Sequence, residues 1–250
     1  MNLTVCVDAV YKDKDFITSV KEIAEAGYKA IEMWFPAMKD LAALKEVQEQ
    51  YGIKTAFIMP GFAPMAMADK QNMFVEMVQQ NLELGKQIDC PNLYVCAGPE
   101  TADPLEKQKE VIGLAIEAAL PYIEAANGNL VLEPLNTKVD HPGSALYLTS
   151  QAIDIVKKIG NPRIKVLYDI YHMQIMEGNI IATATENLDW IGHIHCAGTP
   201  GRHEIYKGEI DYPYVLKAIE AAGYNGYFGM EYFSTDNQKE ALTKTLQMLG

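Results

Sequence analysis

The sequence predicts an α/β fold, a single-domain (β/α)8 barrel that takes in residues 1–250. Three observations support it. Short β-rich runs alternate with segments of helical periodicity, the runs begin about every thirty residues, and eight of them span the chain. The runs are nearly continuously apolar, which is typical of parallel strands buried on both faces. Eight such regular units favour a closed parallel barrel with helices outside.

The predicted strands and helices follow one another along the chain. Strands are expected at Leu3–Val7, Lys29–Trp34, Ile53–Ile58, Asn92–Cys96, Leu130–Glu133, Ile164–Asp169, Trp190–Cys196 and Gly226–Glu231. The helices between them include Phe16–Ala26, Leu41–Tyr51, Met73–Gln87, Leu105–Ala125 and Ala152–Ile159. Glycine commonly ends a helix, and it stands where helices should stop at Gly27, Gly52, Gly160 and Gly223.

An open, doubly wound sheet is the alternative architecture. That fold carries a glycine-rich phosphate loop after its first strand, but Asp8, Ala9, Val10 and Tyr11 stand there instead. No linker or low-complexity stretch marks a second domain. The closed barrel therefore remains the prediction.

Composition and charge restrict the partners that we expect. Hydrophobic residues make up 49% of the chain and charged residues 22%, as in an ordinary globular protein. The formal charge is 21 − 33 = −12, which disfavours a nucleic-acid partner because phosphate backbones are bound by basic residues. No apolar run approaches the roughly eighteen residues of a membrane span, so no membrane association is expected.

The chain start and the cysteines predict a cytoplasmic protein. Residues 1–8 show no basic segment before an apolar one, so no signal peptide is expected. Cys6, Cys90, Cys96 and Cys196 are scattered, which favours free thiols in a reducing compartment over disulfides or a zinc ribbon. A homo-oligomer, a dimer or a tetramer, is also expected.

Four consecutive predicted strands end in an ionisable side chain. These are Glu133, Asp169, His195 and Glu231, and the carboxyl ends of barrel strands are where catalytic groups gather. Each has a structural explanation when taken alone: a solvated loop glutamate, a helix-capping aspartate, a hydrogen-bonded core histidine. His193 shares the strand face of His195 and fits the core explanation better.

Together the four residues predict a site for one divalent cation. Three carboxylates at one barrel mouth would repel one another or stay protonated without a cation. Three carboxylates and one imidazole suit Mn²⁺ or Mg²⁺ and leave positions open for substrate oxygens. Cys196 points to the opposite face of its strand and is expected to pack rather than to ligate.

The same site suggests a reaction. Glu133 and Glu231 flank the predicted cation and are the candidate catalytic acid and base. A small substrate chelated through a carbonyl and an adjacent hydroxyl would have an acidified C–H bond. Returning the removed proton to the neighbouring carbon is an aldose–ketose type isomerisation. Returning it to the other face of the same carbon is an epimerisation.

Other side chains are candidates for binding a small-molecule substrate. His172 lies just beyond the sixth strand, Arg202 can clamp a carboxylate or a hydroxyl pair, and Trp34 can wall the pocket. The alternatives are a solvated loop for Arg202 and core or interface packing for Trp34. Glu32 could point inward, although nothing in the sequence requires it. Residues 59–67, rich in Gly, Pro and Met, predict a loop that could cover the mouth.

Five runs carry a family resemblance. They are Glu133–Asn136, Tyr168–Gln174, Ile191–His195, Pro200–Glu204 and Gly208–Tyr212. They resemble the hydroxypyruvate isomerase family, TIM barrels grouped with the ketose 3-epimerases among the sugar-phosphate isomerases and epimerases. The similarity spans essentially the whole chain and is densest over residues 130–231.

The resemblance implies roles for the candidate residues. Glu133 and Glu231 are implied as the paired acid and base, and as metal ligands with Asp169 and the residue at 195. His172 and Arg202 match positions that contact substrate.

One position departs from the hydroxypyruvate isomerase pattern. Hydroxypyruvate isomerases carry Gln where this chain has His195, whereas ketose 3-epimerases carry His. We therefore expect conversion of hydroxypyruvate to tartronate semialdehyde, with a ketose 3-epimerase or another small sugar or tetronate isomerase as the alternative.

Two remoter functions are a nuclease and a metal-free binding protein. Apurinic endonucleases share the superfamily but take extra zinc-ligating histidines from strands two and three, where this chain has Trp34 and Met59. Gly201 also stands where an acidic ligand would be expected. Metal retention on dialysis would separate a binding protein from an enzyme.

Overall fold

Eight parallel strands close into a barrel in the computed structural model, which describes residues 1–250. Each strand pairs with the next along the chain, and β8 pairs with β1. The strands are β1 (Asn2–Cys6), β2 (Ala30–Trp34), β3 (Lys54–Met59), β4 (Asn92–Cys96), β5 (Asn129–Glu133), β6 (Ile164–Asp169), β7 (Ile191–Cys196) and β8 (Tyr227–Met230). The predicted single-domain (β/α)8 barrel is confirmed.

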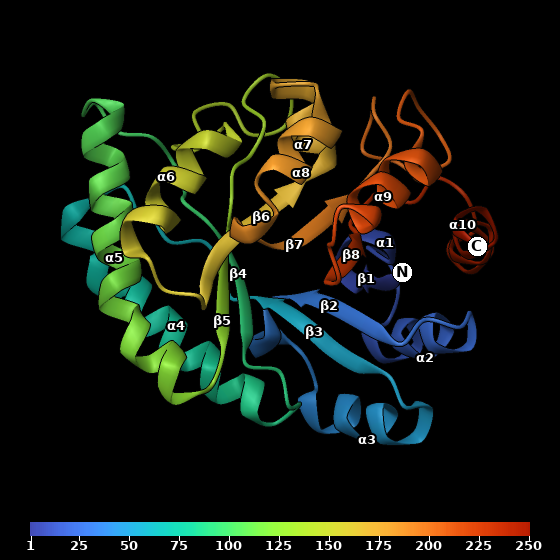
Figure 1. Cartoon of the computed structure of the whole chain (residues 1–250). Helices are drawn as coiled ribbons and strands as arrows, with labels where there is room; N and C mark the ends of the chain where they lie inside the picture. The colour runs from blue at the N-terminus through green and yellow to red at the C-terminus, as the bar shows by residue number, and fades with distance from the viewer.

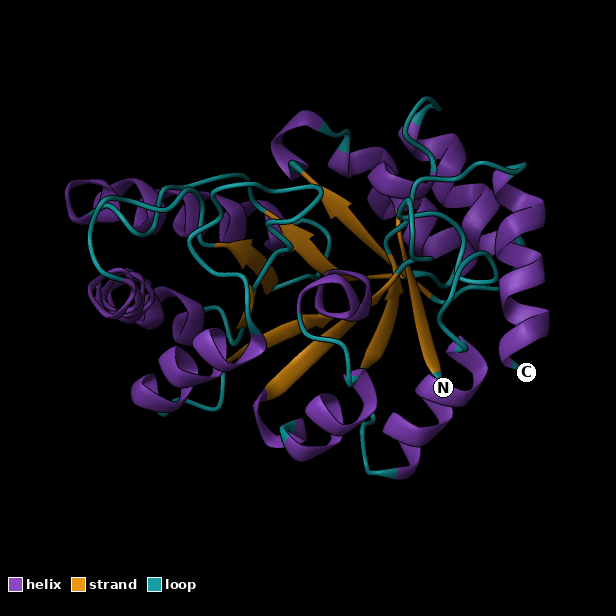
Figure 2. Cartoon of the chain, turned by 90° about the horizontal axis from the view of Figure 1, so that it is seen from above, coloured by secondary structure: helices purple, strands orange, loops and turns teal.

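Helices surround the strands, as Figure 2 shows from above. They are α1 (Val7–Val10), α2 (Phe16–Glu25), α3 (Leu41–Tyr51), α4 (Gln71–Lys86), α5 (Leu105–Ala125), α6 (Thr149–Ile159), α7 (Ile170–Met176), α8 (Ile180–Glu186), α9 (Tyr212–Ala221) and α10 (Gln238–Leu249). Three 3-10 turns, at Pro36–Met38, Ala68–Lys70 and Leu188–Trp190, complete the connections. The last helix, α10, packs beside α2 and so closes the outer ring (Figure 1).

The helices begin and end where their terminal residues dictate. Asp15 accepts a hydrogen bond from the N–H of Thr18 and starts α2, and Asp40 likewise starts α3. Gly52 and Gly160 adopt the left-handed conformation directly after α3 and α6, as the sequence predicts. None of the helices has both the length and the apolar content needed to cross a bilayer.

The last strand is shorter than the sequence predicts. β8 ends at Met230 rather than at Glu231, although the N–H of Glu231 still donates to the carbonyl of Cys196 in β7 at 3.2 Å. Glu231 therefore lies just beyond the strand, on the rim of the barrel.

Close backbone contact explains one helical glycine and yields a stability prediction. A Cβ on Gly85 of α4 would lie 2.1 Å from the carbonyl oxygen of Cys90, just before β4, whereas Gly113 of α5 has only Ile155 Cγ2, at 3.8 Å. Gly85→Ala should lower the free energy of unfolding by about 1–3 kcal/mol through forced displacement. Gly113→Ala should raise it by about 0.5–1 kcal/mol through helix propensity. Denaturant titration of both variants checks this pair, and equal effects would contradict it.

Candidate metal centre

Four ionisable side chains meet at the rim formed by the last four strands. Glu133 ends β5, Asp169 ends β6, His195 lies one residue before the end of β7, and Glu231 follows β8. One ligand atom from each lies within 4.8 Å of the others, and all four side chains are buried. The structure thus brings together the residues for which the sequence predicts a cation. Their role as ligands remains a prediction.

Asp169 is held in place by the helix that it starts. As the N-cap of α7, its Oδ1 accepts a hydrogen bond from the N–H of Tyr171 at 2.8 Å. With Oδ1 engaged in this way, Oδ2 faces the centre and lies 3.5 Å from His172 Nε2.

The atoms that face the centre lack hydrogen-bond partners. Glu133 Oε1, Asp169 Oδ2 and His195 Nδ1 are buried and make no hydrogen bond. Buried polar atoms in this state destabilise a fold unless something binds them. Two carboxylate oxygens and one imidazole nitrogen, with Glu231 beside them, form a donor set that suits a divalent cation. The residues therefore fit the metal that the sequence predicts.

Glu231 is surrounded by donors. Its Oε1 accepts hydrogen bonds from Trp34 Nε1 at 3.1 Å and Tyr94 Oη at 3.2 Å, and its Oε2 contacts the guanidinium of Arg202. Burial raises the pKa of Glu231, but the charges of His195 and Arg202 outweigh burial and hold that pKa far below its usual range. Glu231 is therefore ionised.

Glu133 has a weaker set of partners. Its one hydrogen bond comes from the thiol of Cys96, 3.5 Å from Oε2. Burial, followed by the negative charge of Glu231, raises the pKa of Glu133 to about 8. Without a metal, Glu133 therefore holds a proton more readily than Glu231 does.

His172 presents an N–H to the same centre. Asn136 uses its carbonyl oxygen to accept two backbone N–H groups of the following loop, so its amide nitrogen donates to His172 Nδ1 at 2.7 Å. A ring nitrogen that accepts leaves the proton on Nε2, which lies 3.8 Å from Glu133 Oε1. Burial, and then the charge of Arg202, lower the pKa of His172, so the ring is a neutral donor.

Arg202 and Trp34 contact the protein's own carboxylates. The guanidinium of Arg202 contacts Glu231, lies 3.5 Å from Asp169 Oδ2, and is almost completely buried, which rules out the solvated-loop alternative. Trp34 is half-buried at the end of β2, and its indole N–H points at Glu231 rather than into an apolar core. Their contact with substrate, like that of His172, remains a prediction.

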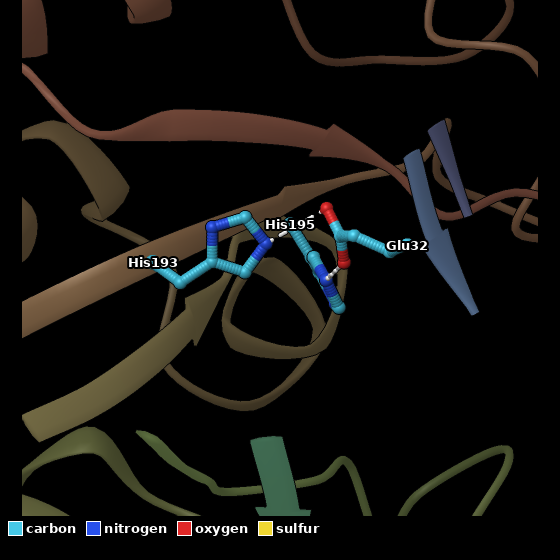
Figure 3. Close-up of side chains that lie close together, drawn as sticks. All are labelled: Glu32, His193 and His195. Atoms are coloured by element: carbon cyan, nitrogen blue, oxygen red, sulfur yellow. Dashed lines mark hydrogen bonds and ion pairs between the residues drawn. The ribbon is translucent and has the colours of Figure 1, made fainter. Parts of the chain in front are cut away.

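The sequence left open whether Glu32 of β2 points inward, and it did not predict the contacts that this side chain makes. Its carboxylate points inward and accepts hydrogen bonds from His193 Nε2 at 2.9 Å and His195 Nε2 at 2.7 Å (Figure 3). Burial alone would raise the pKa of Glu32, but the two imidazoles lower it to about 2. The core interpretation of His193 is confirmed by its complete burial. Cys196 packs in the apolar core, as predicted, and all four cysteines are free thiols.

A cavity of about 450 Å³ opens beside Glu133. Cys96, which contacts Glu133, lines it together with Leu135 and His141 from the loop after β5. Phe62 of the loop after β3 also lines it and is 64% exposed. The predicted loop over residues 59–67 begins one residue later, because Met59 still belongs to β3, and it borders the cavity through Phe62, Ala63 and Pro64.

Comparison with known proteins now assigns the family. Residues 20–250 match the family model of the xylose isomerase-like TIM barrel. The chain belongs to this family. Among curated relatives, the 2-oxo-tetronate isomerase of Cupriavidus necator is 31% identical over 89% of each chain. The hydroxypyruvate isomerase of Escherichia coli is 30% identical over 89% of this chain and 90% of its own. These relatives confirm the resemblance to the hydroxypyruvate isomerase family and identify the protein as an isomerase.

Solved structures confirm the fold of this isomerase. The crystal structure of AP endonuclease, family 2, from Brucella melitensis superposes with a TM-score of 0.92 and 24% identity, covering 99% of both chains. The structure of L-ribulose 3-epimerase superposes with a TM-score of 0.85 and 19% identity, covering 100% of this chain and 95% of the other. Because the sequence identities are below 25%, these two structures show only that the chains share a fold.

The protonation of the centre predicts that metal binding releases protons. Glu133 has a pKa of about 8 without metal, so an ion bound at the predicted site would displace a proton from it below that pH. The Mn²⁺ affinity of the isomerase should rise with pH from 6 to 8, by up to about tenfold per pH unit for each proton released.

Calorimetry in two buffers of different protonation enthalpy measures the number of protons released. Glu133→Gln, which carries no titrating proton, should release fewer than the wild type. Binding that is independent of both buffer and pH would contradict this picture of the site.

Proposed function

We propose that this isomerase depends on one divalent cation, Mn²⁺ or Mg²⁺, and moves a proton between adjacent carbons of a small hydroxy-carbonyl acid. Hydroxypyruvate and tartronate semialdehyde are the leading substrate pair, in line with the hydroxypyruvate isomerase among the curated relatives. We also place the reaction in the cytoplasm, a reducing setting that suits four free thiols.

The unequal pair of glutamates is the observation that carries this proposal. Both glutamates belong to the same donor set, but their hydrogen-bond partners differ. Three donors stabilise Glu231 as an anion, whereas Glu133 accepts a hydrogen bond only from the thiol of Cys96. A group that takes and returns a proton works best when its pKa lies near the working pH, so we assign the proton transfer chiefly to Glu133. Glu231 supplies constant negative charge beside it.

The surrounding residues supply the remaining requirements. A divalent cation bound at the centre would polarise a substrate carbonyl. His172 Nε2 would donate to a substrate oxygen, and the guanidinium of Arg202 would pair with a carboxylate. Burial of the four proposed metal-binding side chains limits water at the site and strengthens these interactions.

A ketose 3-epimerase is the second candidate function. The imidazole at 195 is the residue that such epimerases carry at this position, and the structure places it at the centre. The neighbouring cavity of about 450 Å³ would also accommodate a chain longer than three carbons. In an epimerase, the proton returns to the same carbon on the other face.

Exchange of substrate C–H in D₂O tests both candidates in one assay. Hydroxypyruvate, tartronate semialdehyde, tetrulosonates and free ketoses are incubated with the metal-loaded enzyme, and deuterium is located by mass spectrometry. We expect enzyme-dependent label in the three-carbon pair. Label confined to C3 of a ketose would instead support the epimerase.

Substitution of either glutamate should abolish this exchange. Glu133→Gln and Glu231→Gln remove a proton acceptor or its partner charge and should lower the exchange rate by about 10²–10⁴-fold at saturating metal. Glu110→Gln, on the exposed surface of α5, is the matched control and should leave the rate unchanged. Exchange at the wild-type rate in either site variant would refute the assignment.

A further inference from the structure

We infer that Glu32 is a positioning residue that sets the protonation and the ring orientation of His195, so that His195 Nδ1 faces the metal centre. The inference rests on the metal site of the proposed function, although it does not depend on the isomerase reaction. It assigns a role to a buried charge that the proposed proton transfer does not use.

The hydrogen bonds of Glu32 determine which imidazole nitrogen is free. Its side chain crosses the barrel interior from β2 to β7, where Oε2 lies 2.7 Å from His195 Nε2 (Figure 3). An ionised carboxylate only accepts hydrogen bonds, so His195 must carry a proton on Nε2. The other ring nitrogen, Nδ1, faces the centre, where it lies 3.3 Å from Glu231 Oε2 and 3.9 Å from Glu133 Oε1, and it can bind an ion once the second proton of the cationic ring is displaced.

His193 holds the other oxygen of the same carboxylate. His193 Nε2 lies 2.9 Å from Glu32 Oε1, so both oxygens are engaged and the carboxylate cannot rotate freely. Aromatic neighbours hold both rings: Phe57 stacks on His193 at 4.4 Å, and the edge contact between Tyr94 and His195 spans 5.2 Å. The hydrogen bond to Glu32 and the contact with Tyr94 thus fix the orientation of the His195 ring.

Gly229 of β8 leaves room for this cluster. A Cβ at that position would lie 2.4 Å from Glu32 Oε1 and 2.8 Å from His195 Cδ2. The space that a side chain of β8 would fill is therefore occupied by the carboxylate and the imidazole. This contact explains a glycine in the middle of a buried strand.

Neither a second cation nor a purely structural ion pair accounts for the cluster as well. A cation between Glu32 and the two histidines would require both hydrogen bonds to break, because separations of 2.7–2.9 Å leave no room for an ion. A purely structural ion pair would be a costly way to fill a core. Burying a carboxylate costs several kcal/mol, and apolar residues generally stabilise a core as well or better. A positioning role accounts for a charge in this place.

The test compares Glu32→Gln with Glu204→Gln. Glu204 is also fully buried, but it accepts hydrogen bonds from the backbone of Thr235 and Asp236 rather than from His195. Mn²⁺ affinity is measured by electron paramagnetic resonance of the free ion. Glu32→Gln should weaken binding by about 10- to 100-fold, whereas Glu204→Gln should bind as the wild type does. Unchanged affinity in folded Glu32→Gln would overturn the inference.

Nitrogen NMR reports which ring nitrogens of His195 carry a proton, and a purely structural role of Glu32 would not change that protonation. The chain has five histidines, so ¹⁵N-histidine labelling gives an assignable spectrum. In the wild type, metal-free or loaded with Mg²⁺, His195 Nε2 should carry a hydrogen-bonded proton. In Glu32→Gln the amide offers only one acceptor to two imidazoles, and at least one ring should change its tautomer. An unprotonated Nε2 of His195 in the wild type would overturn the inference even if no variant folded.

A second variant perturbs the same contact without changing any polar atom. Gly229→Ala should displace Glu32 and weaken Mn²⁺ binding in the same direction. Wild-type affinity in this variant, when it is folded by circular dichroism, would count against the inference. If the wild type itself bound no metal, the proposed function would fail, and the NMR measurement on the metal-free protein would still decide whether Glu32 sets the protonation of His195.

Discussion

Mutual repulsion of buried carboxylates is the constraint on which the rest of this structure depends. Glu133, Asp169 and Glu231 offer oxygens within 4.8 Å of one another at the barrel rim. Two unit charges about 4 Å apart repel by on the order of 4 kcal/mol even with the partial screening typical of proteins. The fold can hold such a cluster only if positive charge or protons compensate it. The charges of His195 and Arg202 and a proton on Glu133 do so in part, and a divalent cation would complete the compensation.

The surrounding elements direct the charged groups toward this one point. α7 engages one oxygen of Asp169, and Asn136 sets the tautomer of His172. In the positioning role that we infer for it, Glu32 does the same for His195 from inside the barrel. In each of these side chains, one polar atom is hydrogen-bonded to the surrounding protein, and the other polar atom is left free to face the centre. Such hydrogen bonds pre-organise a site without straining it.

Much of the fold and part of the site could be predicted from sequence, because they depend on local pattern. The spacing of apolar runs predicts the barrel, and the four rim residues follow from strand ends in a parallel closed sheet. Contacts across the barrel could not be predicted in this way. Side chains alternate between the two faces of a strand, so the sequence allows Glu32 to face inward. It does not show that the carboxylate reaches β7, because that contact depends on barrel closure and on the space at Gly229.

Anomalous diffraction at the manganese edge from crystals grown with Mn²⁺ tests the central claim most directly. The account predicts one peak about 2 Å from oxygens of Glu133, Asp169 and Glu231 and from His195 Nδ1. A peak elsewhere, with these four side chains unengaged, would contradict the account. So would an ion bound through His195 Nε2, since the hydrogen bond to Glu32 would then be absent.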